Sequence, residues 1–581
     1  MPEQANHLTN RQKVYLLESE LEQNRESFIP LWRDLSDFVL PRRSRFFITD
    51  NNKGDRRNLK IIDSTATLAS RTFASGMMTG VTSPARSWFK LGLTNFGQDT
   101  SDSTKGYLEE VTDVIRQTFL LSNLYNVLPT IYEDLGTFGT ACMFMESDPD
   151  EGVRFTSFPI GSYAVANDRK GRARVFWREF QMSVRQIVDK FGRGGKHYGP
   201  VDWTNISQTV RDQWERGQSE EMINVSHMIK PNPKFRPGSP VPKFKRYVEL
   251  YYERGTDGET QKSHVSADLE EKFLSEKGYS YFPILCVRWQ VTGEDTYGTM
   301  CPGMIALGDI KALQLGEKRI AQALDQKVNP SMVGPTALKN AKASILPGDI
   351  TYIDERDGTP SFRKLFDVNF DIRELEAKQE QVRQRISRSF YEDLFLMLAN
   401  STRREITARE IEERHEEKLL ALGPVLESIN QDLLDPMIDN TFNILTDLDR
   451  LPEVPQELQG QDYKVEYISV MAQAQKIAGI GNLERFMGFA GQVAQFDPVV
   501  LKKVDTPEML EEYADKVGIS VSLLRSNEEV EKMVEEEQQL IRQQQELEQL
   551  NQAADVGQKL GNTEITESNA LGQVLGVPEG V

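Results

Sequence analysis

The chain has 581 residues, more than one ordinary hydrophobic core accommodates, so several substructures are expected. Its composition is that of a globular protein, with 39% hydrophobic and 27% charged residues. No run reaches the roughly eighteen apolar residues that a membrane span needs, and the polar first ten residues do not resemble a signal peptide. We therefore expect the product in the cytoplasm where it is made. The net charge of −19 argues against a protein that grips DNA tightly, because such proteins are usually basic.

The three cysteines, Cys142, Cys286 and Cys301, are odd in number and far apart in the sequence. This pattern predicts neither a disulfide framework nor a cysteine zinc site. The five histidines are scattered and form no metal-binding pair at helical spacing. We expect no metal and no cofactor.

The N-terminal third is predicted to be mainly helical. Apolar residues at helical spacing predict a helix over 11–40, and a second helix should begin at Asp63 or Ser64. Small residues in that second helix, at Ala69, Gly76 and Gly80, would allow another backbone to approach closely. Residues 105–145 are predicted to be helical again. The basic stretch 41–60 between the first two helices is either a solvated loop or a contact with DNA or an acidic neighbour.

From Gly152 onward, short aromatic and β-branched runs alternate with turn signals. This pattern predicts an α+β fold with antiparallel strands. The predicted strands are 154–158, 163–167, 172–180, 246–253 and 282–289.

The middle of the chain predicts a helix, a compact insertion and a second helix. Pro302 suits a first helical turn, and the first helix should run to about Lys327 because Asn329-Pro330 follows. The segment 328–370 is rich in proline and contains strand-like runs at 350–353 and 362–366. The second helix should begin at Asp371 and continue to 397.

The C-terminal part is predicted to be helical. Thr407 and Glu410 form a capping box after a polar turn, and Pro424 should kink the helix that follows. Pro436 should kink it again or open a separate helix. From about 464 the chain should be helical once more, with a Glu- and Gln-rich helix after Ser526 that is either solvated or self-associating. The Gly-rich tail from about 553 is predicted to be disordered.

The motifs of common enzymes are missing from the sequence. There is no Gly-x-x-x-x-Gly-Lys-Ser/Thr loop to cradle ATP phosphates, and the Gly-rich stretch from Gly192 to His197 lacks that spacing and its hydroxyl residue. There is also no His-Glu-x-x-His zinc motif and no Gly-x-Ser-x-Gly nucleophile motif. We therefore expect a protein that is not an enzyme.

Ordered motifs along the chain resemble the head-to-tail connecting (portal) protein family of short-tailed bacteriophages. The central signature contains Pro283, Trp289, Tyr297-Gly298, Pro302-Gly303, Ala306-Leu307, Asp309, Lys311, Leu313 and Asn329-Pro330. The upstream matches are Trp32, Leu40 to Arg43, Asp63 to Ala66, Ala74 to Met77, Ser83-Pro84, Trp88-Phe89, Ser122-Asn123, Tyr125 and Phe138 to Ala141. The downstream matches are Thr407-Ala408, Glu410, Arg414, Glu417, Leu422 to Pro424, Pro436 and Leu451-Pro452. Each motif is weak by itself, but their order over about 28–455 is specific.

The resemblance implies a ring of about twelve subunits at one capsid vertex, through which double-stranded DNA is packaged and ejected. Its expected parts are an N-terminal wing (1–301), a stem of two helices (302–327 and 371–397), a clip (328–370), a tunnel loop (398–406), a long kinked wing helix (407–463), a helical crown (464–555) and a tail (556–581). The implied partners are terminase during packaging, tail adaptor proteins afterwards, and capsid, scaffolding and internal core proteins, with no membrane. The virion vertex is the implied location.

Arg403 and Arg404 are the candidate DNA contacts, because they lie on a polar loop just before a predicted helix. They could instead pair with glutamates of a neighbouring subunit. Lys339 and Lys342 in the clip are weaker candidates and could simply be solvated. Two other functions stay open: a capsid-internal scaffolding protein, suggested by the Glu/Gln-rich helix, and a packaging ATPase or nuclease, which the missing phosphate loop disfavours.

Overall fold

The computed structural model describes residues 10–50, 54–93, 102–195, 198–255, 273–328, 332–333, 363–364, 372–400, 422–455 and 463–468, with a few helical residues between 486 and 542. The chain divides into two compact units, residues 1–475 and 476–581. Every helix and strand with defined bounds lies in the first unit.

The N-terminal segment forms two helices, α1 (Asn10–Glu26) and α2 (Ile29–Phe38), where the sequence predicted one over 11–40. Pro30 explains the break, because it lacks an N–H group and its ring clashes with the carbonyl four residues earlier. That carbonyl belongs to Glu26, where α1 ends. The prediction of a continuous helix was therefore wrong.

Three helices follow, α3 (Thr65–Gly80), α4 (Asp102–Leu121) and α5 (Leu124–Phe138). The start of α3 agrees with the prediction, and Asp63 Oδ1 accepts the backbone N–H of Thr65 at 2.8 Å. The predicted helix over 105–145 was wrong after Phe138. Gly139 takes a left-handed conformation (φ 75°) that ends α5, and a strand begins at Thr140.

Most of the described strands belong to two larger antiparallel sheets, and this mixture of helices and sheets confirms the predicted α+β class. The three-stranded sheet has the order β3 (Gly152–Phe158), β2 (Thr140–Asp148), β9 (Ile284–Arg288). The five-stranded sheet has the order β4 (Tyr163–Asn167), β5 (Ala173–Ser183), β6 (Met222–Pro231), β7 (Tyr247–Gly255), β8 (Ser275–Tyr279). The short helices α6 (Val184–Ile187) and α7 (Gln208–Glu215) lie between β5 and β6 in the chain.

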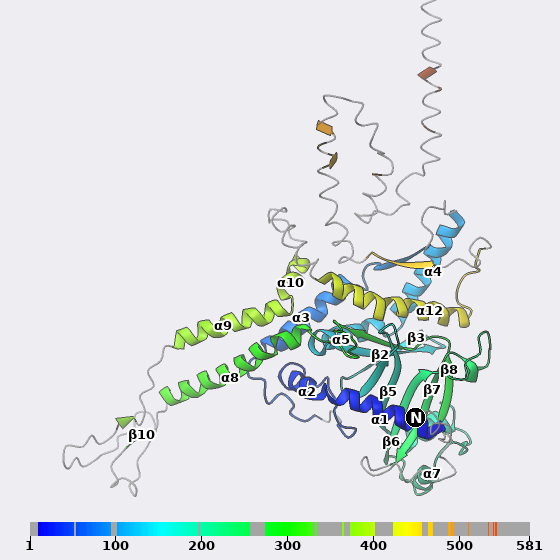
Figure 1. The fold of residues 1–581 in the computed structure, drawn as a ribbon, viewed down its shortest axis with the longest axis horizontal. Coiled ribbons are helices and arrows are strands. Elements are labelled where there is room, and N and C mark those ends of the chain that lie inside the picture. The colour runs from blue at the N-terminus through cyan, green and yellow to red at the C-terminus, as the bar shows by residue number, and fades with distance from the viewer. Residues whose placement is uncertain are drawn as a thin grey trace, which may run out of the picture. The chain divides into compact units, whose positions relative to one another are not determined.

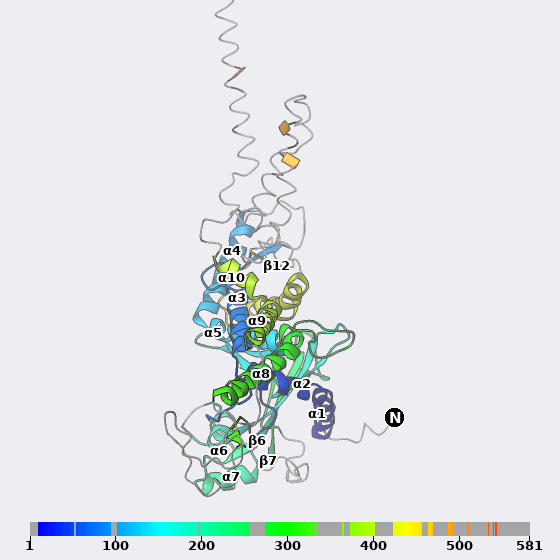
Figure 2. The same ribbon diagram turned by 90° about the vertical axis from the view of Figure 1, so that its left-hand side faces the viewer.

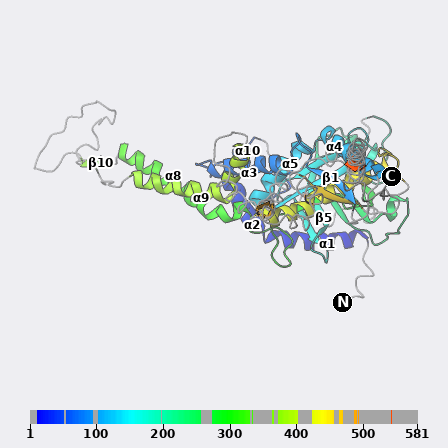
Figure 3. The same ribbon diagram turned by 90° about the horizontal axis from the view of Figure 1, so that it is seen from above.

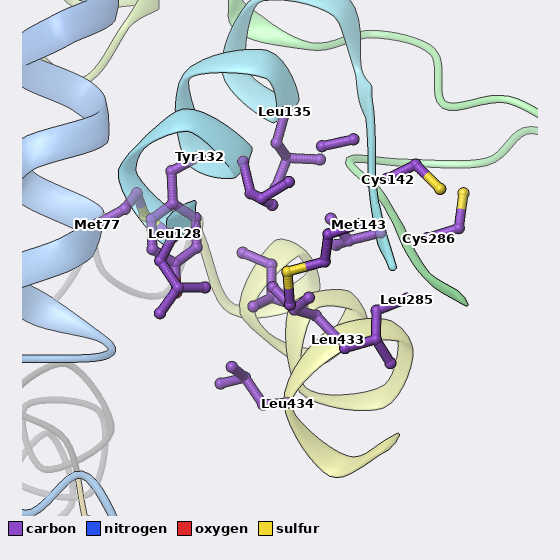
Figure 4. Packing of buried hydrophobic residues seen from close by; sticks show 14 of the residues in the cluster. Met77, Leu128, Tyr132, Leu135, Cys142, Met143, Leu285, Cys286, Leu433 and Leu434 are labelled. Atoms are coloured by element: carbon purple, nitrogen blue, oxygen red, sulfur yellow. The ribbon is translucent and has the colours of Figure 1, made fainter. Parts of the chain in front are cut away.

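The two sheets and the helices share a layered core (Figures 1 and 2). Helix α1 covers one face of the five-stranded sheet, where Val14 and Leu21 belong to the same buried cluster as Trp177. The other face of that sheet meets the three-stranded sheet, with the Phe158 and Phe176 rings stacked at 5.2 Å. Figure 4 shows the core on the far side of the three-stranded sheet, where α3 and α5 bring their apolar side chains against β2 and β9.

Two long helices, α8 (Pro302–Val328) and α9 (Ile372–Ser389), lie side by side as a hairpin (Figures 1 and 3). They confirm the two predicted helices, whereas most of the predicted insertion between them lies outside the described residues. Within the insertion, β10 (Met332–Val333) pairs with β11 (Arg363–Lys364), which lies in the predicted strand 362–366. The predicted strand 350–353 lies outside the described residues. The second helix ends earlier than predicted, because Tyr391 adopts a left-handed φ of 57° and a separate helix, α10 (Glu392–Asn400), follows.

The described C-terminal elements of the first unit pack on the sheets. Residues 422–447 are helical without a break: a π-helical turn over Asn430–Leu434 leads directly into α12 (Asp435–Asp447), which carries Pro436 in its first turn. Strand β12 (Tyr463–Tyr467) pairs with β1 (Phe89–Leu93), so the predicted helix from 464 was wrong at its start. The capping box at Thr407 and the one at Ser526 lie outside the described residues. Among the helices that the structure describes, none is both long and apolar enough to cross a membrane.

Candidate functional site

The α8–α9 hairpin, which we call the stem, forms the candidate site together with the elements at its base. Its first turn is fixed to the end of α5. The Cys301 thiol donates a hydrogen bond to the Thr137 carbonyl at 3.2 Å, and a Cβ on Gly303 would lie only 2.4 Å from that same oxygen. Only glycine therefore allows α8 to begin this close to α5, which explains the Pro302-Gly303 motif in physical terms.

Tyr297 and Gly298 hold the chain that leads into α8. Tyr297 is fully buried, with its ring edge-on to Trp32 at 5.0 Å. A Cβ on Gly298 would lie 1.9 Å from the carbonyl oxygen of Gly139, so these two glycine backbones touch. The signature residues of the central motif thus tie the stem to α2 and α5.

Arg383 on α9 is the centre of an ion-pair network that joins three segments. Its guanidinium contacts Asp63 at 2.9 Å, Glu317 on α8 at 2.6 Å and Glu380 at 3.4 Å. Partial burial raises the pKa of Asp63, but hydrogen bonds from Thr65 and Arg383 outweigh burial and hold the pKa below its usual value. The network therefore favours the charged carboxylate at the junction between α3 and the stem.

Gln314 forms hydrogen bonds with the backbone N–H and carbonyl groups of the loop before α3. Its side-chain oxygen accepts the N–H groups of Ile62 at 2.6 Å and Asp63 at 2.8 Å, and its amide nitrogen donates to the Asp63 carbonyl at 2.8 Å. The Gln314 side chain is almost completely buried. These three bonds fix the side of α8 that faces the loop.

Two further ion pairs cover other sides of α8. Asp309 accepts two hydrogen bonds from Arg385 of α9, at 3.0 and 2.7 Å, and this contact lowers the pKa of Asp309. Lys311 contacts Asp34 of α2 at 2.6 Å. Helix α8 is therefore covered by α9, by the loop before α3 and by α2.

The remaining side of α8 is exposed and apolar, and we call it the α8 stripe. It consists of Ile305, Gly308, Ala312 and Leu315, which all lie on one helical face because they are spaced by three or four residues. Ile305 is 60% exposed and Leu315 is 49% exposed. A row of exposed apolar residues on a helix that is otherwise covered indicates an interaction surface.

The opposite helix presents a different surface. The outward face of α9 carries the exposed residues Gln381, Gln384 and Arg388, and the exposed carboxylate of Glu380 lies one turn before Gln384. Beyond Tyr391, α10 packs on α3, and Phe395 lies edge-on to Phe73 at 5.6 Å. The sequence suggested that Gly76 allows another backbone to approach. In the structure, the Phe395 ring packs there instead.

The residues proposed from the sequence as DNA or clip contacts are not brought together by any described contact. Arg403 and Arg404 lie in 401–421, and Lys339 and Lys342 lie in 334–362, all outside the described residues. Sequence reasoning missed the α8 stripe, although the spacing of Ile305, Ala312 and Leu315 was visible as a second apolar set beside the predicted core face.

The basic stretch 41–60 makes internal ion pairs. Arg43 reaches Asp134, with Nε and Oδ1 3.0 Å apart, and Lys60 contacts Asp37 at 2.6 Å. Arg57 pairs with Asp50. Arg43, Arg57 and Lys60 are thus paired within the subunit, and a contact of this stretch with DNA or an acidic neighbour stays a prediction. In the part of the chain that the structure describes, no group of His, Cys, Asp and Glu side chains is arranged to hold a metal ion.

Comparisons with known proteins agree with the resemblance. The model of the family described as bacteriophage head to tail connecting protein matches residues 11–524. The chain is 41% identical over 563 residues to the portal protein of Salmonella phage epsilon15, covering 97% of each chain. It is 40% identical over 568 residues to the probable portal protein of Bordetella phage BPP-1, covering 97% of this chain and 98% of that one. The chain thus belongs to the family of bacteriophage head-to-tail connecting proteins.

Proposed function

We propose that this chain is a phage portal subunit. About twelve copies form a ring at one capsid vertex, and double-stranded DNA is packaged and later ejected through that ring. Terminase docks on the ring during packaging, and tail adaptor proteins replace it afterwards. The ring is built in the host cytoplasm with capsid and scaffolding proteins, and it stays at the head–tail junction of the virion. Its role is structural, and the packaging ATPase is a separate protein.

The α8 stripe is the observation that carries this proposal. Three sides of α8 are occupied within the subunit, by α9, by the loop before α3 and by α2. The fourth side exposes Ile305 and Leu315, whose apolar surface would be stabilised by contact with another molecule. A contact between this stripe and a different face of the next copy is heterologous, and such contacts build a ring when the rotation between successive copies closes on itself.

We assign the expected parts of a portal subunit to this chain with revised boundaries. The stem is α8 and α9, and the clip is the segment between them that contains the β10–β11 pair. Residues 1–301 with 407–463 form the wing, 401–406 belongs to the tunnel loop, 464–555 forms the crown and 556–581 is the tail. Lys339 and Lys342 contribute to the docking surface of the clip.

The exposed face of α9 is proposed to line the channel. Gln381 and Gln384 offer neutral polar groups, and Arg388 adds one cation per subunit. Arg403 and Arg404 on the tunnel loop contact DNA phosphates, while the net charge of −19 prevents the ring from binding DNA tightly. The duplex is thus enclosed and lightly held.

Electron microscopy of the purified full-length protein tests the ring. We expect annular particles with a central hole, and we expect Leu315→Glu to give mostly monomers, because it places a charge in the apolar contact. Leu16→Glu is the matched control, since Leu16 is 60% exposed on α1 and distant in sequence from the stem. Rings that form equally well from the Leu315→Glu variant would contradict the role of the stripe.

A further inference from the structure

Two of the three cysteines lie directly opposite each other on neighbouring strands. In the antiparallel pairing of β2 and β9, Cys142 is the register partner of Cys286. Both side chains are buried. No local sequence pattern predicts this pair, because about 140 residues separate the two positions and only the fold brings them together.

The hydrogen-bond pattern shows which kind of pair this is. The N–H of Met145 donates to the Pro283 carbonyl at 2.9 Å, and the N–H of Trp289 donates to the Gly139 carbonyl at 2.9 Å. Bonded and non-bonded pairs alternate along an antiparallel ladder. The pair of Cys142 and Cys286 lies three positions from each of these two hydrogen-bonded pairs. It is therefore a non-bonded pair, the type in which the side chains lie closer together.

The geometry of such a pair suits a disulfide. The Cα atoms of a non-bonded pair are about 4.5 Å apart, within the range of roughly 4.4–6.8 Å that disulfides span. Figure 4 shows the two sulfur atoms turned toward each other between β2 and β9. The Cys142 thiol lies close enough to interact with Cys286, and burial together with this contact raises the pKa of Cys142.

We propose that Cys142 and Cys286 are a latent disulfide, reduced in the cell where the protein is made and closed when the protein meets an oxidising medium. A small disulfide oxidant such as oxidised glutathione supplies the chemistry. The two protein thiols lose two protons and two electrons, one protein S–S bond forms, and the oxidant's S–S bond breaks to give two thiols. Reducing compartments keep such pairs open, and oxidising ones allow them to close.

Burial controls the rate of this reaction. The reactive species is the thiolate, and a buried thiol rarely ionises, so closure needs a brief opening of the sheet. Strand β9 is at the edge of the three-stranded sheet, where such opening requires the loss of pairing with only one neighbour, β2. Cys301 lies directly before α8, and its thiol donates a hydrogen bond to the Thr137 carbonyl. It therefore serves as the reference thiol against which the labelling of Cys142 and Cys286 is compared.

The bond would fasten β9 to the middle strand of its sheet. Residues 289–301 lead from the end of β9 directly into α8. The disulfide therefore fixes the chain that enters the stem, from the face of the sheet opposite to that of Met143 and Leu285 (Figure 4). The effect on the stem matters for ring assembly only if the proposed function is correct. The formation of the disulfide does not depend on that function.

Peptide mapping of the purified full-length protein tests the proposal. The protein is incubated with oxidised glutathione just below its unfolding temperature, then unfolded without reductant in N-ethylmaleimide and digested. We expect one linked peptide that joins Cys142 to Cys286, loss of maleimide label at these two of the three cysteines, recovery of both labels after dithiothreitol, and a raised unfolding temperature of the oxidised form.

Cys286→Ala is the matched control, since a buried free cysteine packs like a small apolar residue. In this variant Cys142 and Cys301 should both take the label after the same oxidation, with an unchanged circular dichroism spectrum. Full labelling of Cys142 and Cys286 in the oxidised parent protein, or a linked peptide that contains Cys301, would overturn the proposal. Ring formation can be scored in the same samples, so a failure of the disulfide is distinguishable from a failure of the ring.

Discussion

His227 lies fully buried between the two sheets, in a network of polar side chains. Its Nε2 is 2.8 Å from Glu249 Oε1, and its ring stacks on Tyr251 with the centroids 4.2 Å apart. Burial lowers the pKa of His227 to about 4, although the contact with Glu249 opposes the change. The imidazole is therefore neutral at pH 7, and Nε2 is the nitrogen that can donate to the carboxylate.

A lowered histidine pKa makes the fold sensitive to acid. The unfolded chain binds a proton near pH 6.5, and the folded chain binds it only near pH 4, so the free energy of unfolding falls by about 3 kcal/mol as the pH drops between these values. We expect His227→Gln to reduce this slope, while its lost ring stack destabilises the protein at pH 7.5. Urea unfolding at a series of pH values measures both effects. An unchanged slope would show that other groups cause the acid sensitivity.

Glu179 should have the opposite dependence on pH. Burial raises the pKa of Glu179 to about 7, and the nearby Glu22 adds to the rise while Arg25 opposes it. The folded state thus holds a proton that the unfolded state releases near pH 4.5. Stability is then lost as the pH rises from about 4.5 to about 7, by up to about 3 kcal/mol.

Glu179→Gln removes this titration and should stabilise the protein at pH 8 by up to about 3 kcal/mol, with little effect at pH 5. Urea unfolding at the two pH values measures the difference. Glu220→Gln is a suitable control, because Glu220 is an exposed partner of Arg185 and such surface pairs contribute little. Equal effects of Glu179→Gln at both pH values would contradict the raised pKa.

The sequence did not predict these buried titratable groups. His227 was visible only as one of five scattered histidines. Its burial depends on β7, which supplies Glu249 and Tyr251, and on Phe144 from the other sheet. A side chain's pKa follows from neighbours that the fold brings together, so local sequence patterns carry no signal for it.

Among the elements, those with strong local signals agreed with prediction. Helix α8 begins at Pro302 as expected and ends at Val328, one residue past the predicted end, because Asn329-Pro330 stops the helix. Strand β2 was predicted as helix because its residues are buried on both faces and show no alternation. The break at Tyr391 was also missed, since a non-glycine residue with positive φ leaves no local signature and is stabilised by the packing of α10 on α3.

That packing can be tested with a single methyl group. A Cβ on Gly76 would lie 2.1 Å from Phe395 Cγ, so Gly76→Ala should displace the ring and destabilise the fold by about 1–3 kcal/mol. Gly106→Ala on α4 is the control, because nothing lies within 4 Å of the added Cβ and alanine favours a helix over glycine by about 1 kcal/mol. Thermal unfolding measures both. A Gly76→Ala protein as stable as its parent would mean that α10 does not rest on α3.

At the scale of the whole molecule, the ordered motifs identified the family, but the ring could not be derived from one chain. Whether the α8 stripe is exposed depends on which sides of α8 are covered by α2, α9 and the loop before α3. Periodicity reveals the apolar positions, such as Ile305 and Leu315, without telling a core face from an interface. The DNA-contact candidates Arg403 and Arg404 remain predictions.

Removing those cations should affect DNA and leave assembly intact. Phage carrying Arg403→Ala and Arg404→Ala should form heads of normal composition but package or retain less DNA, because phosphate contacts in the channel are lost. The DNA content of purified particles measures the effect, and Arg185→Ala, which removes an exposed cation on α6, is the control. Full DNA content in the double variant would show that these arginines do not hold DNA in the channel.

Deleting the clip should separate docking from folding. Replacement of 329–371 by a short Gly/Ser linker leaves α8 and α9 packed, because contacts such as Arg385 with Asp309 and Arg383 with Glu317 lie within the hairpin. We expect loss of terminase and tail-adaptor binding in pull-down experiments, with an unchanged circular dichroism signal from the remaining helices. Undiminished capture of the adaptor would place its docking surface elsewhere.

The pairing of β1 with β12 also sets the order in which the protein can be completed. Leu91 lies opposite Val465, about 370 residues later in the chain. At about 5–20 residues per second, a ribosome needs roughly 20–70 seconds to make that interval. During this time β1 has an open edge, which is a template for pairing with other chains. Nascent chains on one polysome can therefore aggregate with one another through β1 until β12 emerges. A messenger truncated before codon 463 would yield a product in which the hydrogen-bonding edge of β1 stays unpaired.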